Sequence, residues 1–166
     1  PRYGKTVEVN ALHNKSDLLA ALPSLARNEE NAKRYGSMAD KVRDSFRNSF
    51  WNDSKGYLND CILPDGSIDD SLRPNQIFAV SLNFSPLSEK QQASVVEVVQ
   101  KHLLTPYGLR TLSPDAADYK GEYTGPMRQR DEAYHQGTVW PYLIGPFIEA
   151  YLKVNKFSPE SKYQAA

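Results

Sequence analysis

Apolar residues recur at intervals of three and four positions in separate stretches of this chain, and this spacing limits its fold more than any other feature. On an α-helix, residues at this spacing lie on one face, which is buried against a neighbouring element. The pattern predicts helices over residues 8–26, 28–50, 74–85, 88–105 and 138–152. We therefore expect an all-α fold whose helices pack through apolar stripes.

The stretch over residues 28–50 has the most regular pattern. Its predicted apolar face carries Tyr35, Ala39, Val42, Phe46 and Phe50. The first helix, interrupted near Pro23, is predicted to bury Val9, Leu12, Leu19 and Leu22. Two later helices have recognisable starts: Pro74 suits a first helical position, and Ser88 with Gln91 fits a capping box.

The last predicted helix begins near Thr138 or Val139 and has the widest apolar face. That face consists of Trp140, Leu143, Ile144, Phe147, Ile148, Tyr151 and Leu152. Its width predicts burial on more than one side. Pro146 lacks a backbone donor and is expected to kink the helix.

Two irregular segments separate the helices. Residues 56–72 contain a Pro-Asp-Gly turn and predict one short hairpin. Residues 105–133 form a long loop rich in aromatic and charged side chains, and such loops are uncommon unless functional. We divide the chain into residues 1–155, one domain segment, and residues 156–166, a polar tail expected to fray.

Composition excludes several classes of protein. The 166 residues suffice for one domain, and 20 basic against 20 acidic side chains argue against a nucleic-acid surface or electrostatic membrane docking. Cys61 is the one cysteine, so a reduced, cytoplasmic setting is expected. We find no signal peptide or membrane span in the sequence. The absence of an initiator Met at Pro1 suggests processing or a truncated polypeptide.

Polar clusters precede three of the predicted helices. They are Glu8-Val9-Asn10, Arg73-Pro74-Asn75-Gln76 and Tyr134-His135-Gln136-Gly137. If these helices pack with their N-terminal ends together, the three clusters lie around the opening of one cleft. Residues 134–141 add an indole to neutral hydrogen-bonding groups, which suits sugar hydroxyls and ring faces. The alternative is that these residues only cap their helices.

Glycoside hydrolysis usually requires two carboxyl groups, one protonated and one ionised. Weak candidates for these roles are Glu8, Asp69, Asp131 and Glu132, with Asp70 beside them. No spacing identifies a pair, so the catalytic residues stay unknown from the sequence. Three His residues and Cys61 form no metal-ligand pattern, and no phosphate-binding glycine loop is present.

Four motifs carry a resemblance to a known family. They are GKTVEVNAL at residues 4–12, RPNQIFA at 73–79, LTPYGLRTLS at 104–113 and YHQGTVWP at 134–141. Together they resemble the glucosidase domain of glycogen debranching enzymes, in the same order from Pro1 to about Lys153. One departure is His13, where the family pattern leads us to expect a Trp.

The resemblance implies a segment of an (α/α)6 toroid built from helical hairpins around a sugar cleft. It implies hydrolysis of α-1,6-linked glucose at α-glucan branch points, without a cofactor or metal. The residues that would line the glucose subsites are Glu8, Asn10, Arg73, Asn75, Gln76, Arg110, Tyr134, His135, Gln136 and Trp140.

The resemblance also implies that both catalytic carboxylates lie outside this chain. Its Trp-Met-Asp motif, with the expected acid, would precede Pro1, and a Glu-bearing segment with the base would follow Ala166. The chain alone is then expected to be inactive, with about half a toroid. Apolar helix faces around Leu143, Phe147 and Tyr151 would be exposed and favour self-association.

Two alternatives remain open at this point. One is a non-catalytic glucan-binding or assembly fragment, and the other is a trehalase-like toroidal sugar hydrolase.

Overall fold

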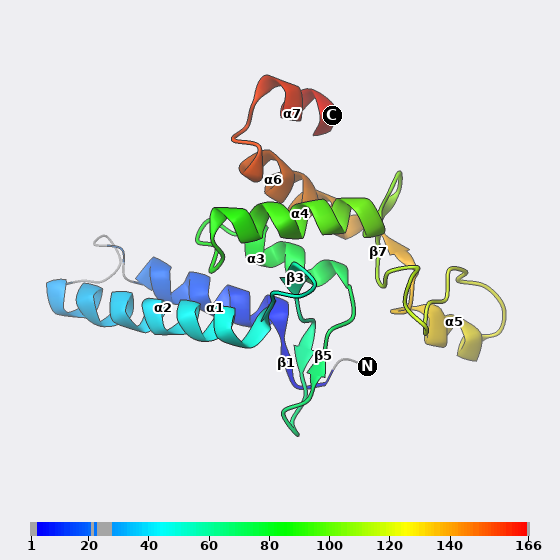
Figure 1. Cartoon of the computed structure of the whole chain (residues 1–166), viewed down its shortest axis with the longest axis horizontal. Helices are drawn as coiled ribbons and strands as arrows, with labels where there is room; N and C mark the ends of the chain where they lie inside the picture. The colour runs from blue at the N-terminus through cyan, green and yellow to red at the C-terminus, as the bar shows by residue number, and fades with distance from the viewer. Residues whose placement is uncertain (1–2, 21, 23–27, 166) are drawn as a thin grey trace.

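The computed structural model describes residues 3–20, 22 and 28–165, where helices predominate and short strands connect them (Figure 1). The helices are α1 (Val7–Ala20), α2 (Glu29–Phe50), α3 (Phe78–Ser81), α4 (Glu89–Leu103), α5 (Met127–Ala133), α6 (Ile144–Val154) and α7 (Pro159–Ala165). Two 3-10 turns, η1 (Pro74–Ile77) and η2 (Pro141–Leu143), lead directly into α3 and α6.

Short strands accompany the helices, so the all-α prediction is only partly right. Their bounds are β1 (Lys5–Thr6), β2 (Trp51–Asn52), β3 (Tyr57–Leu58), β4 (Cys61–Ile62), β5 (Ile68–Asp69), β6 (Leu104–Thr105), β7 (Gly108–Arg110) and β8 (Val139–Trp140). They form three small antiparallel sheets, ordered β1-β4-β5, β2-β3 and β6-β7-β8. Strands of two or three residues are too short to show an alternating pattern. The hairpin predicted in residues 56–72 is present as β4 and β5.

Helices α2 and α4 match the sequence predictions because their signals are local. Asn28 caps α2 by accepting a hydrogen bond from the Asn31 backbone N–H at 2.8 Å. Phe46 and Phe50 of α2 are buried, as predicted. The capping box of α4 is complete, and the helix ends at Leu103, before Pro106.

Helix α1 buries a different face from the predicted one. Val9 and Leu12 are 60% and 45% exposed, whereas Val7, Ala11 and Asn14 are completely buried. The Asn14 side-chain amide donates to the Phe84 carbonyl at 3.1 Å, far along the chain. The buried face therefore includes a polar residue that apolar spacing cannot identify. Residues 21 and 23–26 of the predicted helix lie outside the described residues.

The last predicted helix starts later than expected. Val139 and Trp140 form β8, which pairs with β7, and α6 begins only at Ile144. Pro146 consequently lies in the first turn of α6, where backbone N–H groups have no partner within the helix. The N–H that proline lacks is therefore not missed there, and no kink is expected. The third predicted helix is likewise short, since α3 ends at Ser81, before Pro86.

The core forms where α3 packs against α1, α4 and α6. In Figure 1, α4 lies across α3, and the α1–α2 pair lies to one side. The buried cluster takes residues from all of these helices and from the strands. Leu143 and Phe147 belong to it, at 1% and 5% exposed, and Tyr151 packs against it. The predicted exposure of this apolar face is therefore wrong.

The remaining segments are more ordered than the sequence indicated. Residues 105–133 contain β7 and α5, which Figure 1 shows far from the α1–α2 pair. The tail contains α7, with Ser161 buried, and its fraying stays a prediction. The division at residue 155 and the toroid stay predictions. None of the helices in the described part of the chain has the length and apolar content that a membrane crossing needs.

Candidate functional site

One pocket collects residues from three of the sequence motifs. It has a volume of about 350 Å³ and lies where η1 meets the segment from Tyr134 to Leu143. The polar and aromatic side chains that line it are Arg73, Asn75, Thr111, Tyr134, His135, Trp140 and Tyr142. We call this set the aromatic pocket. No carboxylate of the described residues lines it.

The aromatic side chains of this pocket contact one another. The Tyr134 ring lies 4.7 Å from the Trp140 ring, tilted by 55°, and 4.7 Å from the His135 ring, edge-on at 81°. The Trp140 indole N–H donates to the Tyr134 carbonyl at 3.2 Å. Tyr123 adds a further edge contact to Tyr134 at 5.9 Å. These contacts hold the indole and imidazole in place without a ligand.

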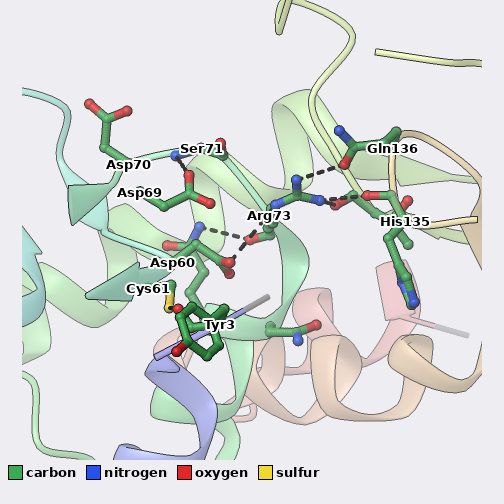
Figure 2. A network of polar contacts seen from close by, with 12 residues as sticks. Tyr3, Asp60, Cys61, Asp69, Asp70, Ser71, Arg73, His135 and Gln136 are labelled. Carbon is green, nitrogen blue, oxygen red and sulfur yellow. Dashed lines mark hydrogen bonds and ion pairs between the residues drawn. The ribbon is translucent and has the colours of Figure 1, made fainter. Parts of the chain in front are cut away.

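Arg73 joins η1 to the loop that carries His135 (Figure 2). Its Nη1 donates to the backbone carbonyls of Thr111 at 3.1 Å and His135 at 2.5 Å. Its Nη2 donates to the Gln136 side-chain oxygen at 2.7 Å. Since Arg73 bonds the backbone of His135, the imidazole stays directed away from the guanidinium, as Figure 2 shows.

Asp60 supports Arg73 from inside the molecule. The Asp60 carboxylate lies 3.8 Å from the Arg73 Nε, and the two side chains are 1% and 13% exposed. A buried carboxylate needs such a cation, because removing it from water is costly. Asp60 directly precedes β4, whose pairing with β1 and β5 fixes its position.

Glu8 and Gln76 have contacts that the sequence did not predict. Glu8 accepts a hydrogen bond from the Asn75 amide at 3.1 Å, so it lies beside the aromatic pocket without lining it. Gln76 is 1% exposed; it accepts from the Leu58 backbone N–H at 3.1 Å and donates to the Arg73 carbonyl at 3.0 Å. Gln76 therefore connects β3 to η1 and faces the core.

Asn10 and Arg110 lie apart from the aromatic pocket. Asn10 donates to the Thr6 carbonyl at 2.7 Å and lines a different cavity, between α1 and α2. Arg110 donates to the Tyr119 hydroxyl at 2.7 Å, with its guanidinium 6.0 Å from the centre of that ring. The third polar cluster, Tyr134 to Gly137, precedes a strand and not a helix, so the proposed capping role does not apply to it.

Comparison with known proteins places the chain in a family. The family model described as amylo-alpha-1,6-glucosidase matches residues 1–166, which is the whole chain. The chain belongs to the amylo-alpha-1,6-glucosidase family. It is also similar to the glycogen debranching enzyme of Saccharomyces cerevisiae, with 31% identity over 91 residues. That match covers 50% of this chain and 6% of the yeast protein.

Glycoside hydrolysis usually requires paired carboxyl groups, so the acidic side chains near the aromatic pocket are relevant to this family. Asp69, Asp131 and Glu132 line a second cavity of about 1140 Å³, which shares Arg73 and His135 with the aromatic pocket. Their presence there does not by itself supply an acid, because the general acid of a glycosidase must be protonated when it acts.

Glu132 does not suit the role of that acid. The Lys120 ammonium, at 2.7 Å, lowers the pKa of the Glu132 carboxyl below its usual value, and Arg128 contributes further. Asp69 accepts the Ser71 backbone N–H at 3.0 Å, as in a turn. In the described part of the chain, no group of three His, Cys, Asp or Glu side chains could hold a metal ion.

Sequence reasoning missed several residues around the pocket. Thr111 accepts a hydrogen bond from the Gly137 backbone N–H through its hydroxyl at 2.9 Å, and Tyr142 lines the pocket. Thr111 follows Arg110 within the third family motif, which was the available signal. Asp60 is not among the candidates from the sequence, because nothing in the local pattern distinguishes it from the neighbouring acidic residues.

Proposed function

We propose that this chain forms part of the sugar cleft of a glycoside hydrolase that removes α-1,6-linked glucose from branched α-glucans. The aromatic pocket is the observation that carries the proposal. Indole and phenol rings offer flat apolar faces to a sugar ring, while Asn75 and His135 offer planar hydrogen-bonding groups to its hydroxyls. Membership of the amylo-alpha-1,6-glucosidase family supports this choice of substrate class.

In this proposal the direct sugar contacts come from Asn75, Tyr134, His135 and Trp140, and Arg73 holds the loop that carries His135. Glu8 would orient Asn75 through their hydrogen bond. Gln76, Gln136 and Arg110 would act on the pocket only through other residues. The fold we propose for the complete enzyme is the (α/α)6 toroid, in which α1 to α6 form helical-hairpin elements.

The carboxylates of the reaction are proposed to come from outside this chain. No acidic side chain of the described residues lines the aromatic pocket, and Glu132 is held ionised by Lys120. The same observation favours, for this chain by itself, the second candidate function: glucan binding without hydrolysis. We expect the 166-residue chain to bind maltooligosaccharides and to release no glucose from limit dextrin.

Tryptophan fluorescence offers a direct test because the chain has two Trp residues. Titration with maltotetraose should change the emission of the chain. Trp140→Phe should abolish that change, whereas Trp51→Phe, which alters an indole outside the pocket, should preserve it. His135→Ala should weaken binding about tenfold, in keeping with a lost hydrogen bond of about 1–3 kcal/mol.

Other results would contradict the proposal. A fluorescence change that persists in Trp140→Phe would place the sugar elsewhere. Preference for trehalose over maltotetraose would favour a trehalase-like hydrolase. Release of glucose by the isolated chain, abolished in Glu8→Gln, would show that it contains its own catalytic carboxylate.

A further inference from the structure

A separate cavity lies between α1, α2 and the sheet that contains β1. It has a volume of about 400 Å³ and is distinct from the aromatic pocket, with which it shares no residue. Three basic side chains line it from three elements: Lys5 from β1, His13 from α1 and Lys41 from α2. No Asp or Glu of the described residues is among its lining side chains. We call it the basic cavity.

The two ammonium groups of the basic cavity, those of Lys5 and Lys41, are available to a ligand. Within the described residues, neither Lys5 nor Lys41 makes an ion pair or side-chain hydrogen bond. Other lysines differ: Lys55 pairs with Asp70 at 2.5 Å, and Lys120 pairs with Glu132 at 2.7 Å. Ammonium groups that face one cavity repel each other, and an anion between them reverses the sign of that interaction.

Hydroxyl donors lie beside these cations. Ser45 and Ser49 are four positions apart on α2, so they share one face, and both line the cavity. Within the described part of the chain, their hydroxyls make no hydrogen bond. A phosphate monoester presents up to two negative charges and three strong acceptor oxygens, which matches two ammonium groups and two hydroxyls.

The floor of the basic cavity is apolar. It consists of Val42, Phe46, Phe50 and Ile62, and the two phenyl rings are 5.0 Å apart. Inorganic phosphate would leave this surface in contact with water, whereas an organic body attached to the phosphate would cover it. The volume is in the range that holds a small organic ligand.

We propose that the basic cavity binds a small organic phosphate monoester of the size of a sugar phosphate. The phosphate lies between Lys5 and Lys41 and accepts hydrogen bonds from Ser45 and Ser49, with the organic body over the phenyl rings. His13, the residue that replaces the Trp expected from the family pattern, lines the edge of this cavity. The site is independent of the function proposed for the aromatic pocket.

The test compares three probes on the 166-residue chain by backbone NMR shifts and calorimetry. They are glucose 6-phosphate, inorganic phosphate and glucose. We expect glucose 6-phosphate to bind in the millimolar range or tighter, and at least about tenfold tighter than either other probe. The shifts should centre on residues 41–50 of α2. Lys5→Gln and Lys41→Gln should each weaken binding about five- to tenfold. These side chains are exposed, so the variants should fold normally.

Lys90→Gln is the matched control, because Lys90 is an exposed lysine of α4 that lines none of the cavities described above. An equal loss in Lys90→Gln would reduce the effect to general electrostatic attraction and overturn the proposal. Equal affinity for glucose, or unchanged affinity in both Lys5→Gln and Lys41→Gln, would also overturn it. Loss of glucose 6-phosphate binding in Trp140→Phe would place the ligand in the aromatic pocket instead. Failure of maltotetraose binding, by contrast, bears only on the function proposed for that pocket.

Discussion

Replacing Arg73 with Met should reveal how strongly one side chain holds the aromatic pocket together. The change keeps much of the apolar stem but removes the guanidinium, and with it the hydrogen bonds to Thr111, His135 and Gln136. It also removes the Arg73 cation from beside Asp60, whose side chain is 1% exposed. The lost hydrogen bonds and the lost ion pair both lower the stability of the folded chain.

The magnitude follows from the burial of the pair. Removing one partner of a buried ion pair costs about 3–5 kcal/mol. Each hydrogen bond from a charged donor contributes about 1.5–3 kcal/mol, but these values overlap with the first and do not add. We expect Arg73→Met to lower the free energy of unfolding by about 3–5 kcal/mol, a large share of the stability of an ordinary domain.

Urea denaturation followed by far-UV circular dichroism measures this loss. Arg73→Lys keeps a positive charge near Asp60 and should cost clearly less, although it loses the planar fork. Asp60→Asn removes the buried charge, so the double variant Arg73→Met, Asp60→Asn should be more stable than the sum of the two single losses by about 1–3 kcal/mol. A loss below about 1 kcal/mol in Arg73→Met, or strict additivity in the double variant, would refute the reasoning.

Three further predictions concern other parts of this region. Gln76→Leu should lower the free energy of unfolding by about 2–5 kcal/mol in the same denaturation assay, because the buried Leu58 N–H and the partly buried Arg73 carbonyl lose their partner. Gly137→Ala should lower the melting temperature, since φ there is +142° and an added Cβ would lie 2.5 Å from the Lys120 carbonyl; Gly145→Ala, with open space, should leave it unchanged or raise it. NMR titration should give a pKa for the Glu132 carboxyl below its usual value, and Lys120→Ala should raise that pKa. Because the pKa is lowered in the folded chain, the contribution of Glu132 to stability is present at neutral pH and is lost as the pH falls through the lowered pKa.

The accuracy of the sequence predictions followed the range of the interactions involved. Helices α2 and α4 were predicted well because their caps and apolar faces are set by residues within a few positions. The buried face of α1 was predicted wrongly because Asn14 is paired with Phe84, 70 positions away. The start of α6 was also wrong, since Trp140 pairs in register with Leu109 of β7 and is thereby drawn into a strand.

At the candidate site, too, some sequence predictions agree with the structure and others do not. Arg73, His135 and Trp140 were expected together and do line one pocket. Gln76 was grouped with them through a polar cluster and a family motif, and Arg110 through a family motif, but neither pattern reveals which side of the backbone a side chain occupies. Gln76 faces Leu58 in the core, and Arg110 faces Tyr119. Their part in sugar contact, like that of the pocket residues, stays a prediction.

Several residues around the aromatic pocket hold irregular backbone in place. Arg73 bonds the carbonyls of Thr111 and His135, and the Thr111 hydroxyl accepts the Gly137 N–H. Lys120 in turn donates its N–H to the Gln136 carbonyl at 2.5 Å. Ordering one residue of a loop costs about 1–2 kcal/mol of conformational entropy. Because these bonds already meet that cost in the free chain, a sugar entering the aromatic pocket would not have to order the loop on binding. Changes to these supporting residues should therefore weaken binding even where every side chain that contacts the sugar is intact.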